Sequence, residues 1–442
     1  MRGPRFGGAV AAASAIALLT SGCLSSGTSD EGSGSGASGP GKKTIEIMFG
    51  FGGDQTQGFK DSLEPFAKAN GLTIKYTQSD SFDTLIRTRQ QGNNLPDIAL
   101  FPQPGLLKDI QKRAQGKMVE LDSVLDMGKI KGSMVPGIAD AAVVDGKTYG
   151  VPVSMNIKSL VFYPKKAFEA KGYKAPQTLD ELKALTAKIK ADGTAPWCVG
   201  YNSGGATGWV GTDWIEELVL KQLGPDKYDQ WVNHELKFDS PEIKGVFQTF
   251  EQLVLADGQT FGGRKSIIST TFQKAANPMF DSPPKCMLHH QGNFVTQKGF
   301  FPDAIWKDIA ANVGAFPFPK DKFDTVLGGG DLAAAFNKDA NVIKVMKEMT
   351  ENSKFGEVWA GPGDRGFISP HKDFDVSKYG NELTRGIAET AYGASGIRFD
   401  GSDAMPGTVG AGSFWKGMVA FTAGQQTIDQ VAKTIDDSWP TS

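Results

Sequence analysis

The segment Lys147–Pro164, KTYGVPVSMNIKSLVFYP, places the strongest constraint on how this chain can fold. Two extended runs within it, Thr148–Val153 and Ser159–Tyr163, are rich in the β-branched and aromatic residues that strands favour. The residues between these runs include no glycine and no turn dipeptide, so nothing in them folds the chain back as a hairpin. We expect the chain to run straight on from one core into another. Asn156 and Lys158 would then be exposed at the junction, where ligand clefts tend to lie.

The length of 442 residues suggests about two domains. The first begins with a strand at 44–49, a glycine-rich turn and a helix that presents Phe59, Leu63 and Phe66 on one face, with Pro65 as a kink or restart. A strand at 72–76, a helix at 82–91 and a strand at 96–101 follow. Strand, helix, strand, helix, strand predicts a parallel α/β sheet.

Two later changes of pattern indicate further crossings between the domains. Three consecutive glycines, Gly328–Gly330, allow a close backbone approach, and the chain is expected to cross there and again near Gly380. Capping boxes at Thr178 and Thr427 predict the starts of two amphipathic helices. Three crossings between two α/β lobes imply a hinge that closes on a ligand.

The first 22 residues have the pattern of a bacterial export signal. Two arginines precede an apolar run, Ala9–Thr20, that is shorter than the ~20 residues needed to span a membrane. The run leads into LTSGC, which resembles a lipobox with Thr20 in place of the usual leucine, and predicts lipidation of Cys23. The Gly/Ser-rich segment up to residue 43 is expected to be a flexible linker. We therefore expect an exported protein, lipid-anchored to the outer face of the cytoplasmic membrane.

The charge balance argues against a nucleic-acid partner. The chain has 47 basic and 49 acidic residues, a net charge of −2, and loss of the two arginines of the signal leaves 45 basic residues and a net charge of −4.

Cys198 and Cys286 remain once Cys23 is set aside. An even pair in an exported, oxidising setting is expected to form a disulfide, and the alternative is two buried free thiols. The chain-entropy model gives roughly 4–5 kcal/mol for closing a loop of this length.

Six segments follow one another in the order of a known family. They are DGKTYGVPVSMNIKSLVFYPKKAF (145–168), LPDIALF (95–101), APWCVGYNSGGATGWVGTDWIEELVL (195–220), KCMLHHQGNF (285–294), GGGDLAAAF (328–336) and RFDGSDAMPGTVGAGSFWKGMVAF (398–421). Together they resemble the family 1 extracellular solute-binding proteins, the receptors of bacterial ATP-dependent (ABC) sugar importers, and within them the α-glucoside and maltose-type binders. Asn156 stands where maltose-type proteins often carry a glutamate, so their ligand preference does not transfer.

The resemblance implies a two-lobed α/β fold of the maltose-binding-protein type, with a ligand cleft between the lobes and three hinge crossings. Lobe I would comprise residues 44–155 and 331–381, and lobe II residues 156–330 and 382–442. A monomer without cofactor or metal, a small carbohydrate ligand and a membrane permease as partner are also implied.

A sugar ring has apolar C–H faces and a rim of hydroxyl groups, so a selective site needs flat aromatic surfaces and planar polar groups. Trp209 and Trp214 flank a loop before a predicted helix, and Trp415 follows a glycine-rich run. The predicted ligand-binding residues are Gly53, Asp54, Asn156, Trp209, Asp213, Trp214, Gln291, Asn293, Asp331, Asp403 and Trp415. Those at positions 156, 331 and 403 rest mainly on the resemblance.

Some of these residues have a structural alternative. Asp213 and Glu216 fit a helix capping box, so Asp213 either caps the helix or contacts a ligand. Asp54 could cap its own helix in the same way. Trp209 and Trp415 could pack in a core instead of stacking on a sugar.

Other chemistries fit the sequence less well. The chain has neither a complete G-x-G-x-x-G run after its first strand nor a Walker-type G-K-[ST], which argues against a nucleotide site. His289 and His290 are adjacent in a predicted strand and point to opposite faces, which does not suit a zinc site. Glu216 and Glu217 diverge by ~100° on a helix and cannot flank one glycosidic bond.

The sequence therefore predicts a binding protein, not an enzyme. It would capture an α-glucoside or a related di- or oligosaccharide and deliver it to an ABC permease. The alternatives are a receptor for a β-linked or amino sugar and, from another class, an extracellular glycoside hydrolase.

Overall fold

The computed structural model describes residues 41–114, 116–361, 363 and 365–440. The predicted signal peptide, Cys23 and the linker up to residue 40 lie outside these residues, so they stay predictions. No helix in the described part of the chain combines the length and the apolar character that a bilayer span requires.

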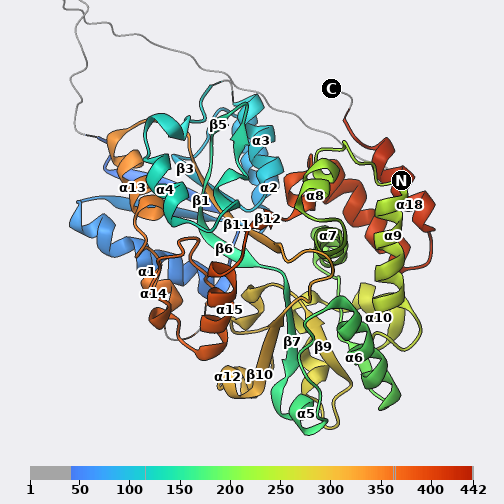
Figure 1. The fold of residues 1–442 in the computed structure, drawn as a ribbon. Coiled ribbons are helices and arrows are strands. Elements are labelled where there is room, and N and C mark those ends of the chain that lie inside the picture. The colour runs from blue at the N-terminus through green and yellow to red at the C-terminus, as the bar shows by residue number, and fades with distance from the viewer. Residues whose placement is uncertain (1–40, 115, 362, 364, 441–442) are drawn as a thin grey trace, which may run out of the picture. The chain divides into compact units, whose positions relative to one another are not determined.

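The first sheet has six strands and contains the N-terminal pattern expected from the sequence (Figure 1). Its N-terminal elements are β1 (Thr44–Phe49), α1 (Gly53–Ala69), β2 (Thr73–Gln78), α2 (Phe82–Gln91) and β3 (Ile98–Phe101). The strand β1 pairs in parallel with both β2 and β3. The helix α1 buries Phe59 and Leu63 against the sheet, and Pro65 lies within it without ending it. The predicted parallel α/β arrangement is confirmed.

The second sheet has four strands. Its order is β10 (Val313–Pro317), β7 (Leu160–Pro164), β9 (Cys286–His290) and β8 (Ala195–Trp197), with only β8 and β9 parallel. The helices α6 (Leu179–Ala191) and α18 (Ile428–Asp437) begin at the two predicted capping boxes, and both boxes are complete.

The first crossing has the predicted form. The strand β6 (Val151–Ile157) pairs with β11 (Val326–Ala335) in the first sheet, whereas β7 belongs to the second (Figure 1). Only Lys158 and Ser159 separate β6 from β7, so most of the expected polar gap is strand. Asn156 is partly exposed as expected, but Lys158 is buried because its ammonium group pairs with carboxylates inside the protein.

The glycine run Gly328–Gly330 lies within β11, which pairs with β3, β6 and β12 (Ile397–Phe399). A Cβ atom on Gly330 would overlap the carbonyl oxygen of Ser154, and the φ angle of Gly330 is +156°. The close backbone approach predicted from these glycines is therefore confirmed.

The chain near Gly380 follows a more complex route than one crossing. The helix α15 (Glu382–Tyr392) packs on β10 of the second sheet, and β12 then returns to the first sheet beside β11. The strand β12 falls within the segment assigned to lobe II, and the lobe boundaries given above stay a prediction.

The remaining elements cover the sheets and connect their strands. They are α3 (Pro104–Arg113), α4 (Met127–Ser133), β4 (Val143–Val144), β5 (Lys147–Thr148), α5 (Lys165–Ala170), α7 (Trp209–Leu223), α8 (Pro225–Val232), α9 (Pro241–Phe250), α10 (Gly263–Ser269), α11 (Asp303–Trp306), α12 (Ile309–Asn312), α13 (Ala340–Glu351), α14 (Glu357–Ala360), α16 (Gly401–Ala404), a π-helix at Val409–Phe414 and α17 (Trp415–Thr422).

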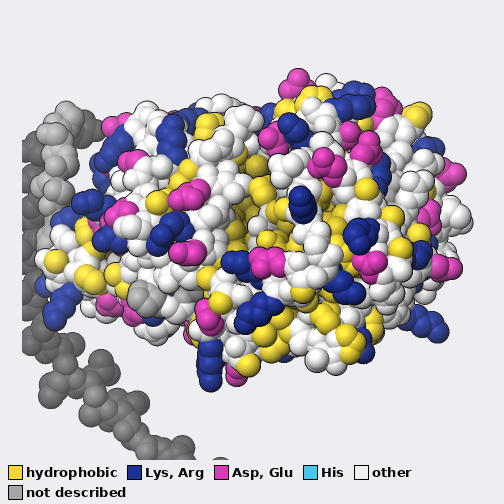
Figure 2. Space-filling view, turned by 60° about the horizontal axis from the view of Figure 1, so that its bottom comes forward, with side chains coloured by type: hydrophobic (Ala, Val, Ile, Leu, Met, Phe, Trp, Pro, Cys, Tyr) yellow, Lys and Arg dark blue, Asp and Glu magenta, His cyan; other side chains and the backbone are white. Residues whose placement is uncertain are grey.

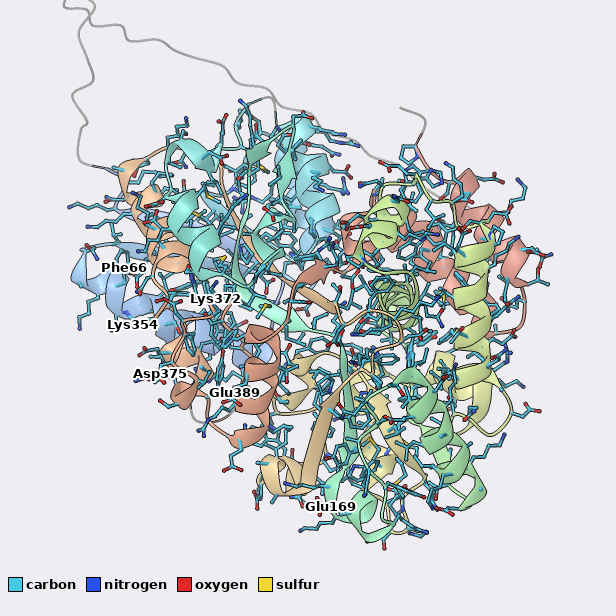
Figure 3. The ribbon with its side chains drawn as sticks, in the orientation of Figure 1. Phe66, Glu169, Lys354, Lys372, Asp375 and Glu389 are labelled. Atoms are coloured by element: carbon cyan, nitrogen blue, oxygen red, sulfur yellow. A yellow bond between two sulfur atoms is a disulfide. The ribbon has the colours of Figure 1, made fainter. Side chains whose placement is uncertain are left out.

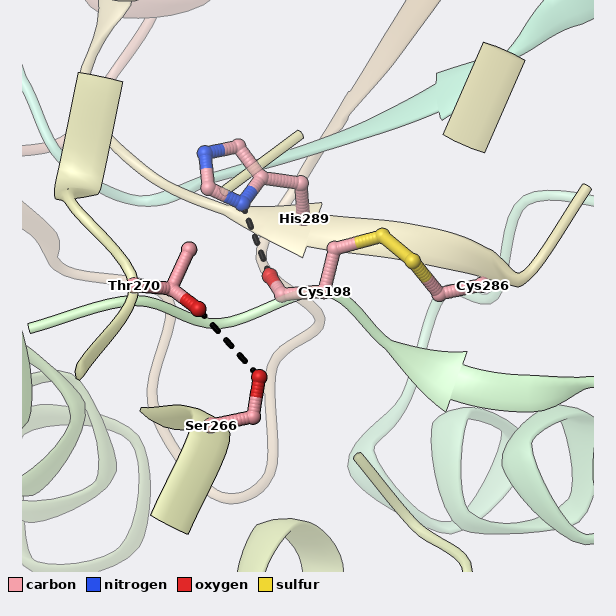
Figure 4. The surroundings of a disulfide bond; sticks show 5 residues. All are labelled: Cys198, Ser266, Thr270, Cys286 and His289. Carbon is pink, nitrogen blue, oxygen red and sulfur yellow. Dashed lines mark hydrogen bonds between the residues drawn. A yellow bond between two sulfur atoms is a disulfide. The ribbon is translucent and has the colours of Figure 1, made fainter. Parts of the chain in front are cut away.

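The predicted disulfide between Cys198 and Cys286 is present and joins the segment after β8 to the start of β9 (Figure 4). Beside it, His289 Nδ1 lies 2.8 Å from the carbonyl oxygen of Cys198. Burial lowers the pKa of His289 to about 4, so the ring is neutral and its Nδ1–H donates to that carbonyl.

Acidic and basic side chains are interspersed over the face shown in Figure 2, without a field of one sign. This distribution agrees with the small net charge of the sequence.

Candidate ligand-binding site

Two tryptophans that start helices are brought together by one glycine. Trp209 is the first residue of α7 and Trp415 the first residue of α17. Gly208, before α7, has φ +119°, and a Cβ atom on it would overlap the backbone of Trp415. A side chain at position 208 would therefore push the two helix starts apart. Both tryptophans are partly exposed, as a stacking surface for a ligand requires.

The two indole rings have different surroundings. The ring of Trp209 makes edge contacts with Phe272 at 5.1 Å and tilted contacts with Phe294 at 6.0 Å, and the Lys158 ammonium lies 5.2 Å from its centre. Trp415 donates its Nε1–H to the hydroxyl of Ser402 at 3.3 Å, and in the described part of the chain no aromatic ring or cation lies against its faces. Trp415 thus offers the freer surface.

Trp214 lies in the core. It is fully buried, meets Trp197 edge to face at 4.8 Å and stacks on His290 at 4.5 Å. A ligand could reach this indole only if the core opened, so Trp214 does not offer the stacking surface expected from the sequence.

The helix α7 begins at Trp209, with Gly208 as its N-cap, four residues before Asp213. The predicted capping box of Asp213 and Glu216 is therefore wrong, because both residues lie inside the helix and their carboxylates reach partners from other segments. Sequence reasoning missed the true start of α7 because the glycine that caps it, Gly208, is required by a close approach to the backbone of Trp415, far away in the sequence.

Asp213, Glu216 and Asp400 form a buried carboxylate cluster around the ammonium group of Lys158. Lys158 donates to Asp213 Oδ1 at 3.0 Å and to Asp400 Oδ2. Glu216 accepts from the backbone N–H groups of Gly401 and Ser402 at 3.0 and 3.1 Å. The cluster ties α7 to the β6–β7 connection and to α16.

Three buried carboxylates and one cation cannot all be charged at low cost. Burial disfavours the charged form of Lys158, but Asp213 and Asp400 outweigh it and hold the pKa of Lys158 well above its usual value. Burial, and then the charge of Asp400, raise the pKa of Glu216 well above its ordinary value. Burial also acts on Asp400, yet the ammonium of Lys158 holds its pKa below the usual value. Lys158 and Asp400 are therefore a charged pair, whereas burial and neighbouring charge disfavour the charged form of Glu216 beside them.

Oxygens of Asp213, Glu216 and Asp400 lie within 4.8 Å of one another, a spacing that a metal ion could bridge. Lys158 already donates to two of the three carboxylates. The chain thus supplies its own cation there.

Asp403 and Asp331 come from different segments and have raised pKa values. Asp403 Oδ1 accepts from Gln103 Nε2 at 3.0 Å, and burial together with the charge of Asp400 raises its pKa to about 7. Asp331 Oδ2 accepts from the hydroxyl of Ser154 at 2.8 Å, and burial raises its pKa to about 6. Both residues remain partly exposed.

Gln103 precedes α3 and is a site residue that the sequence reasoning missed. Near it, a Cβ atom on Gly105 would overlap the carbonyl oxygen of Met405, so α3 and α16 approach closely. The only signal was its place after a buried strand, in FPQPG.

Asn293 and Gln291 lie beneath this region and are buried. Asn293 accepts from the Ile157 N–H at 2.6 Å and donates to the Gly366 carbonyl at 2.9 Å. Gln291 accepts from the Gly292 N–H at 3.0 Å, and its Nε2 has no partner among the described residues. Asn293 therefore links the first crossing to the segment at Gly366.

Gly53 and Asp54 lie at the start of α1. Asp54 is exposed in the first turn, and α1 has no side-chain cap, so the capping alternative for Asp54 is wrong. A Cβ atom on Gly366 would lie 3.3 Å from the side-chain nitrogen of Gln55 and 3.1 Å from the Cα of Phe294. Gly366 thus lies between Gln55, at the start of α1, and Phe294, whose ring contacts Trp209.

A polar groove elsewhere contains none of the predicted residues. It has a volume of about 450 Å³ between α1, α4 and α13, and Phe66 and Lys354, labelled in Figure 3, are at its edge. Its lining mixes lysines with carboxylates, including Lys344, Lys347 and Glu348, and offers no pair of flat aromatic surfaces.

The fold and this arrangement define a class of protein. Two sheets are joined by chain that crosses between them, and the partly exposed side chains of Trp415, Gln103 and Asp403 lie near one another. Solved structures share this fold. A structure from a study of xylan utilisation by Caldanaerobius polysaccharolyticus aligns with a TM-score of 0.71 at 21% identity, covering 89% of this chain and 99% of that chain.

A raffinose complex of the solute-binding protein RafE aligns with a TM-score of 0.67 at 17% identity, covering 90% of this chain and 98% of that chain. Maltose-bound MalE3 of T. maritima aligns with a TM-score of 0.65 at 17% identity, covering 89% and 98%. The predicted two-lobed α/β fold of the maltose-binding-protein type is confirmed.

The chain belongs to the bacterial extracellular solute-binding protein family, whose model matches residues 52–285. It is 37% identical to the osmoprotective compounds-binding protein GgtB of Synechocystis, over 90% of this chain and 93% of that protein. It is 36% identical to the alpha-glucosides-binding periplasmic protein AglE of Rhizobium meliloti, over 90% of this chain and 87% of that protein. The predicted family is confirmed.

Proposed function

We propose that this protein captures an α-glucoside or a related di- or oligosaccharide and delivers it to the permease of an ABC importer. The names of its relatives support this class of ligand, because AglE binds alpha-glucosides by its name and GgtB binds osmoprotective compounds. The observation that carries the proposal is the pair of partly exposed indoles, Trp209 and Trp415, beside Asp403.

The aromatic pair supplies surfaces for the C–H faces of a sugar. The Trp415 ring is oriented through its Nε1–H and, among the described residues, contacts no other aromatic ring and no cation, so we take it as the main stacking surface. The Lys158 ammonium lies over the ring of Trp209, and the partly exposed part of that indole is the second proposed contact for the ligand.

Carboxyl and amide groups supply the polar contacts. Asp403, Asp331 and Gln103 present oxygens and N–H groups that can pair with sugar hydroxyls. Asn156 and the exposed Asp54, with Gly53 beside it, complete the proposed contacts. Asp213, Trp214, Gln291 and Asn293 are buried and would support the site from beneath.

The membrane attachment is a separate part of the proposal. Lipidation of Cys23 would anchor the protein to the outer face of the cytoplasmic membrane. A linker that ends before Lys42, which the structure holds against Asp97 and Asp339, would let a monomeric receptor reach its permease. Mass spectrometry of the membrane fraction tests the anchor, since replacement of Cys23 by alanine should remove the acyl chains.

Calorimetric titration with maltose, trehalose, sucrose and cellobiose tests the ligand class. We expect an α-linked member of this panel to bind with a Kd near micromolar, roughly −8 kcal/mol, which permits both capture and release. A preference for cellobiose, or binding only to an amino sugar added to the panel, would assign another sugar class. Hydrolysis of a bound sugar, measured in parallel, would contradict the receptor and favour a glycoside hydrolase.

A further inference from the structure

Lys158 connects the groups that are proposed to hold the ligand. Its ammonium group has three N–H donors and three neighbours: Asp213, Asp400 and the ring of Trp209, whose centre is 5.2 Å away. The side chain is buried in the two-residue connection between β6 and β7, so water competes little for these donors. Its position is therefore well determined.

One branch from Lys158 leads through Asp400 to Asp403 and Trp415. Asp400 Oδ1 accepts from the Asp403 N–H and from the Ser402 hydroxyl, both at 2.9 Å. The same hydroxyl oxygen accepts from Trp415 Nε1 at 3.3 Å. The orientation of the main stacking surface and the backbone of Asp403 thus both depend on Asp400, which Lys158 holds in place.

The other branch is the direct contact with Trp209. A buried cation over an indole face is attracted by the negative face of the ring and fixes the tilt of that ring. Phe272 and Phe294 also contact the Trp209 ring, at 5.1 and 6.0 Å between ring centres, so Lys158 acts on an indole that aromatic neighbours already hold.

We propose that Lys158 is a positioning residue for ligand binding, which sets Trp209, Trp415 and Asp403 at once without touching the ligand. The inference rests on the proposed function, because it assigns these three residues to the ligand. It predicts that loss of the ammonium group loosens both indoles together, although Trp209 and Trp415 are far apart in the sequence.

Lys221 in α7 provides a matched control. It is at least as buried as Lys158, lies 3.5 Å from Glu217 Oε1 and donates to the Thr325 carbonyl at 3.0 Å. None of these partners is among the proposed ligand contacts. Replacement of either lysine should therefore lower the stability of the fold. Only the replacement of Lys158 should also change the orientation of the indoles.

The first experiment needs no ligand. Near-ultraviolet circular dichroism of the folded domain is recorded for the wild type, Lys158→Met and Lys221→Met, each with and without Trp209→Phe or Trp415→Phe, so that the band of each indole is obtained by difference. We expect Lys158→Met to lose most of both bands and Lys221→Met to keep them. Retention of both bands in Lys158→Met would overturn the inference.

Ser402→Ala keeps the inference testable if Lys158→Met does not fold. This variant removes no charge and cuts the link between Asp400 and Trp415, together with one contact between the hydroxyls of Ser402 and Thr212 at 3.1 Å. We expect it to lose the Trp415 band and to keep the Trp209 band. A preserved Trp415 band would contradict the branch through Asp400.

Sugar titration and pH complete the test. For the α-linked sugar that binds best among maltose, trehalose and sucrose, Lys158→Met should weaken affinity about tenfold while Lys221→Met leaves it unchanged.

Lys158 also lowers the pKa of Asp403, so the midpoint of a pH titration of the tryptophan signal should move upward from about 7 in Lys158→Met. If no sugar binds the wild type, the proposed function fails while the spectra still test Lys158. If sugars bind and the spectra do not change, only the inference fails.

Discussion

The two halves of α7, residues 209–216 and 217–223, which we call its N-terminal and C-terminal ends, use the same kind of buried charge in different settings. At its N-terminal end, Asp213 and Glu216 lie under the proposed ligand contacts and share the ammonium of Lys158 with Asp400. At its C-terminal end, the Ser159 hydroxyl donates to the carboxylate of Glu217, whose two oxygens lie 2.8 and 2.7 Å away, and Lys221 lies beside Glu217. Both ends hold chain that crosses between the sheets, and α7, seen end-on in Figure 1, lies beside these crossings.

The difference teaches that the surroundings, and not the residue type, give a buried ion pair its role. Lys221 fixes the Thr325 carbonyl at the approach to β11, in a region without proposed ligand contacts. Lys158 fixes side chains that reach the partly exposed region around Trp209 and Trp415. Replacement of Lys221 should therefore change stability alone. Replacement of Lys158 should change ligand binding as well.

The largest expected effect is a loss of stability in Lys221→Met. Removal of one partner from a buried ion pair leaves Glu217 uncompensated and typically costs about 3–5 kcal/mol of unfolding free energy. Urea unfolding gives this loss, and the tightest-binding sugar of the panel should keep its Kd. A weaker affinity in the folded variant would show that the two ends of α7 do not differ as proposed.

The next prediction compares Gly208 and Gly224, which flank α7. Both have positive φ angles, +119° and +86°, and a Cβ atom would overlap the Trp415 backbone at the first and lie 2.7 Å from the Phe323 ring at the second. Alanine at either position should cost about 2–3 kcal/mol of stability through backbone strain. Only Gly208→Ala should also weaken sugar binding, because only Gly208 holds the two indoles together. Equal affinities in the two variants would contradict this assignment.

A third prediction separates exposed from buried tryptophan. Trp415→Ala should cost roughly 2 kcal/mol of sugar affinity, the scale of an aromatic hot spot, with little change in melting temperature. Trp214→Phe, in the core, should do the reverse. Titration calorimetry measures the sugar affinity of both variants, and thermal unfolding measures their stability. An unchanged affinity with a large drop in melting temperature in Trp415→Ala would place Trp415 in the core.

The sequence predicted those helices, strands and caps whose formation depends on residues close together in the chain. The strand at 44–49 and the helix at 82–91 have the expected bounds, and both capping boxes are present, because alternation, periodicity and caps act within a few residues. The straight passage from β6 to β7 also followed from the absence of turn residues.

Long-range contacts were beyond this reasoning. The burial of Lys158 depends on carboxylates 55 and 242 residues away, and the role of Gln103 depends on a partner 300 residues away. The start of α7 depends on the backbone of Trp415 in the same way. Nothing near Lys158 or Lys221 in the sequence distinguishes the lysine beneath the proposed site from the lysine in the core.

The smallest expected effect is on the pH dependence of stability, and it belongs to the N-terminal end of α7 alone. The groups that face Asp403 are Asp400, Lys158, Asp331 and the amide of Gln103. In the unfolded chain Asp403 would titrate near ~3.9, whereas in the native protein its pKa is about 7. Between these values the native state binds more protons than the unfolded state, so the free energy of unfolding falls as the pH rises.

Asp403→Asn removes this proton and should reduce the fall in unfolding free energy between pH 5 and 7 by about 1 kcal/mol, after allowance for partial exposure. Lys221→Met should leave the fall unchanged, because its partners lie outside this group. Urea unfolding at pH 5, 6 and 7 measures how the free energy of unfolding changes with pH in the wild type, Asp403→Asn and Lys221→Met. A fall of wild-type size in Asp403→Asn would mean that Asp403 is already ionised at pH 5, and the electrostatic distinction between the two ends of α7 would then rest on Glu216 and Asp400 alone.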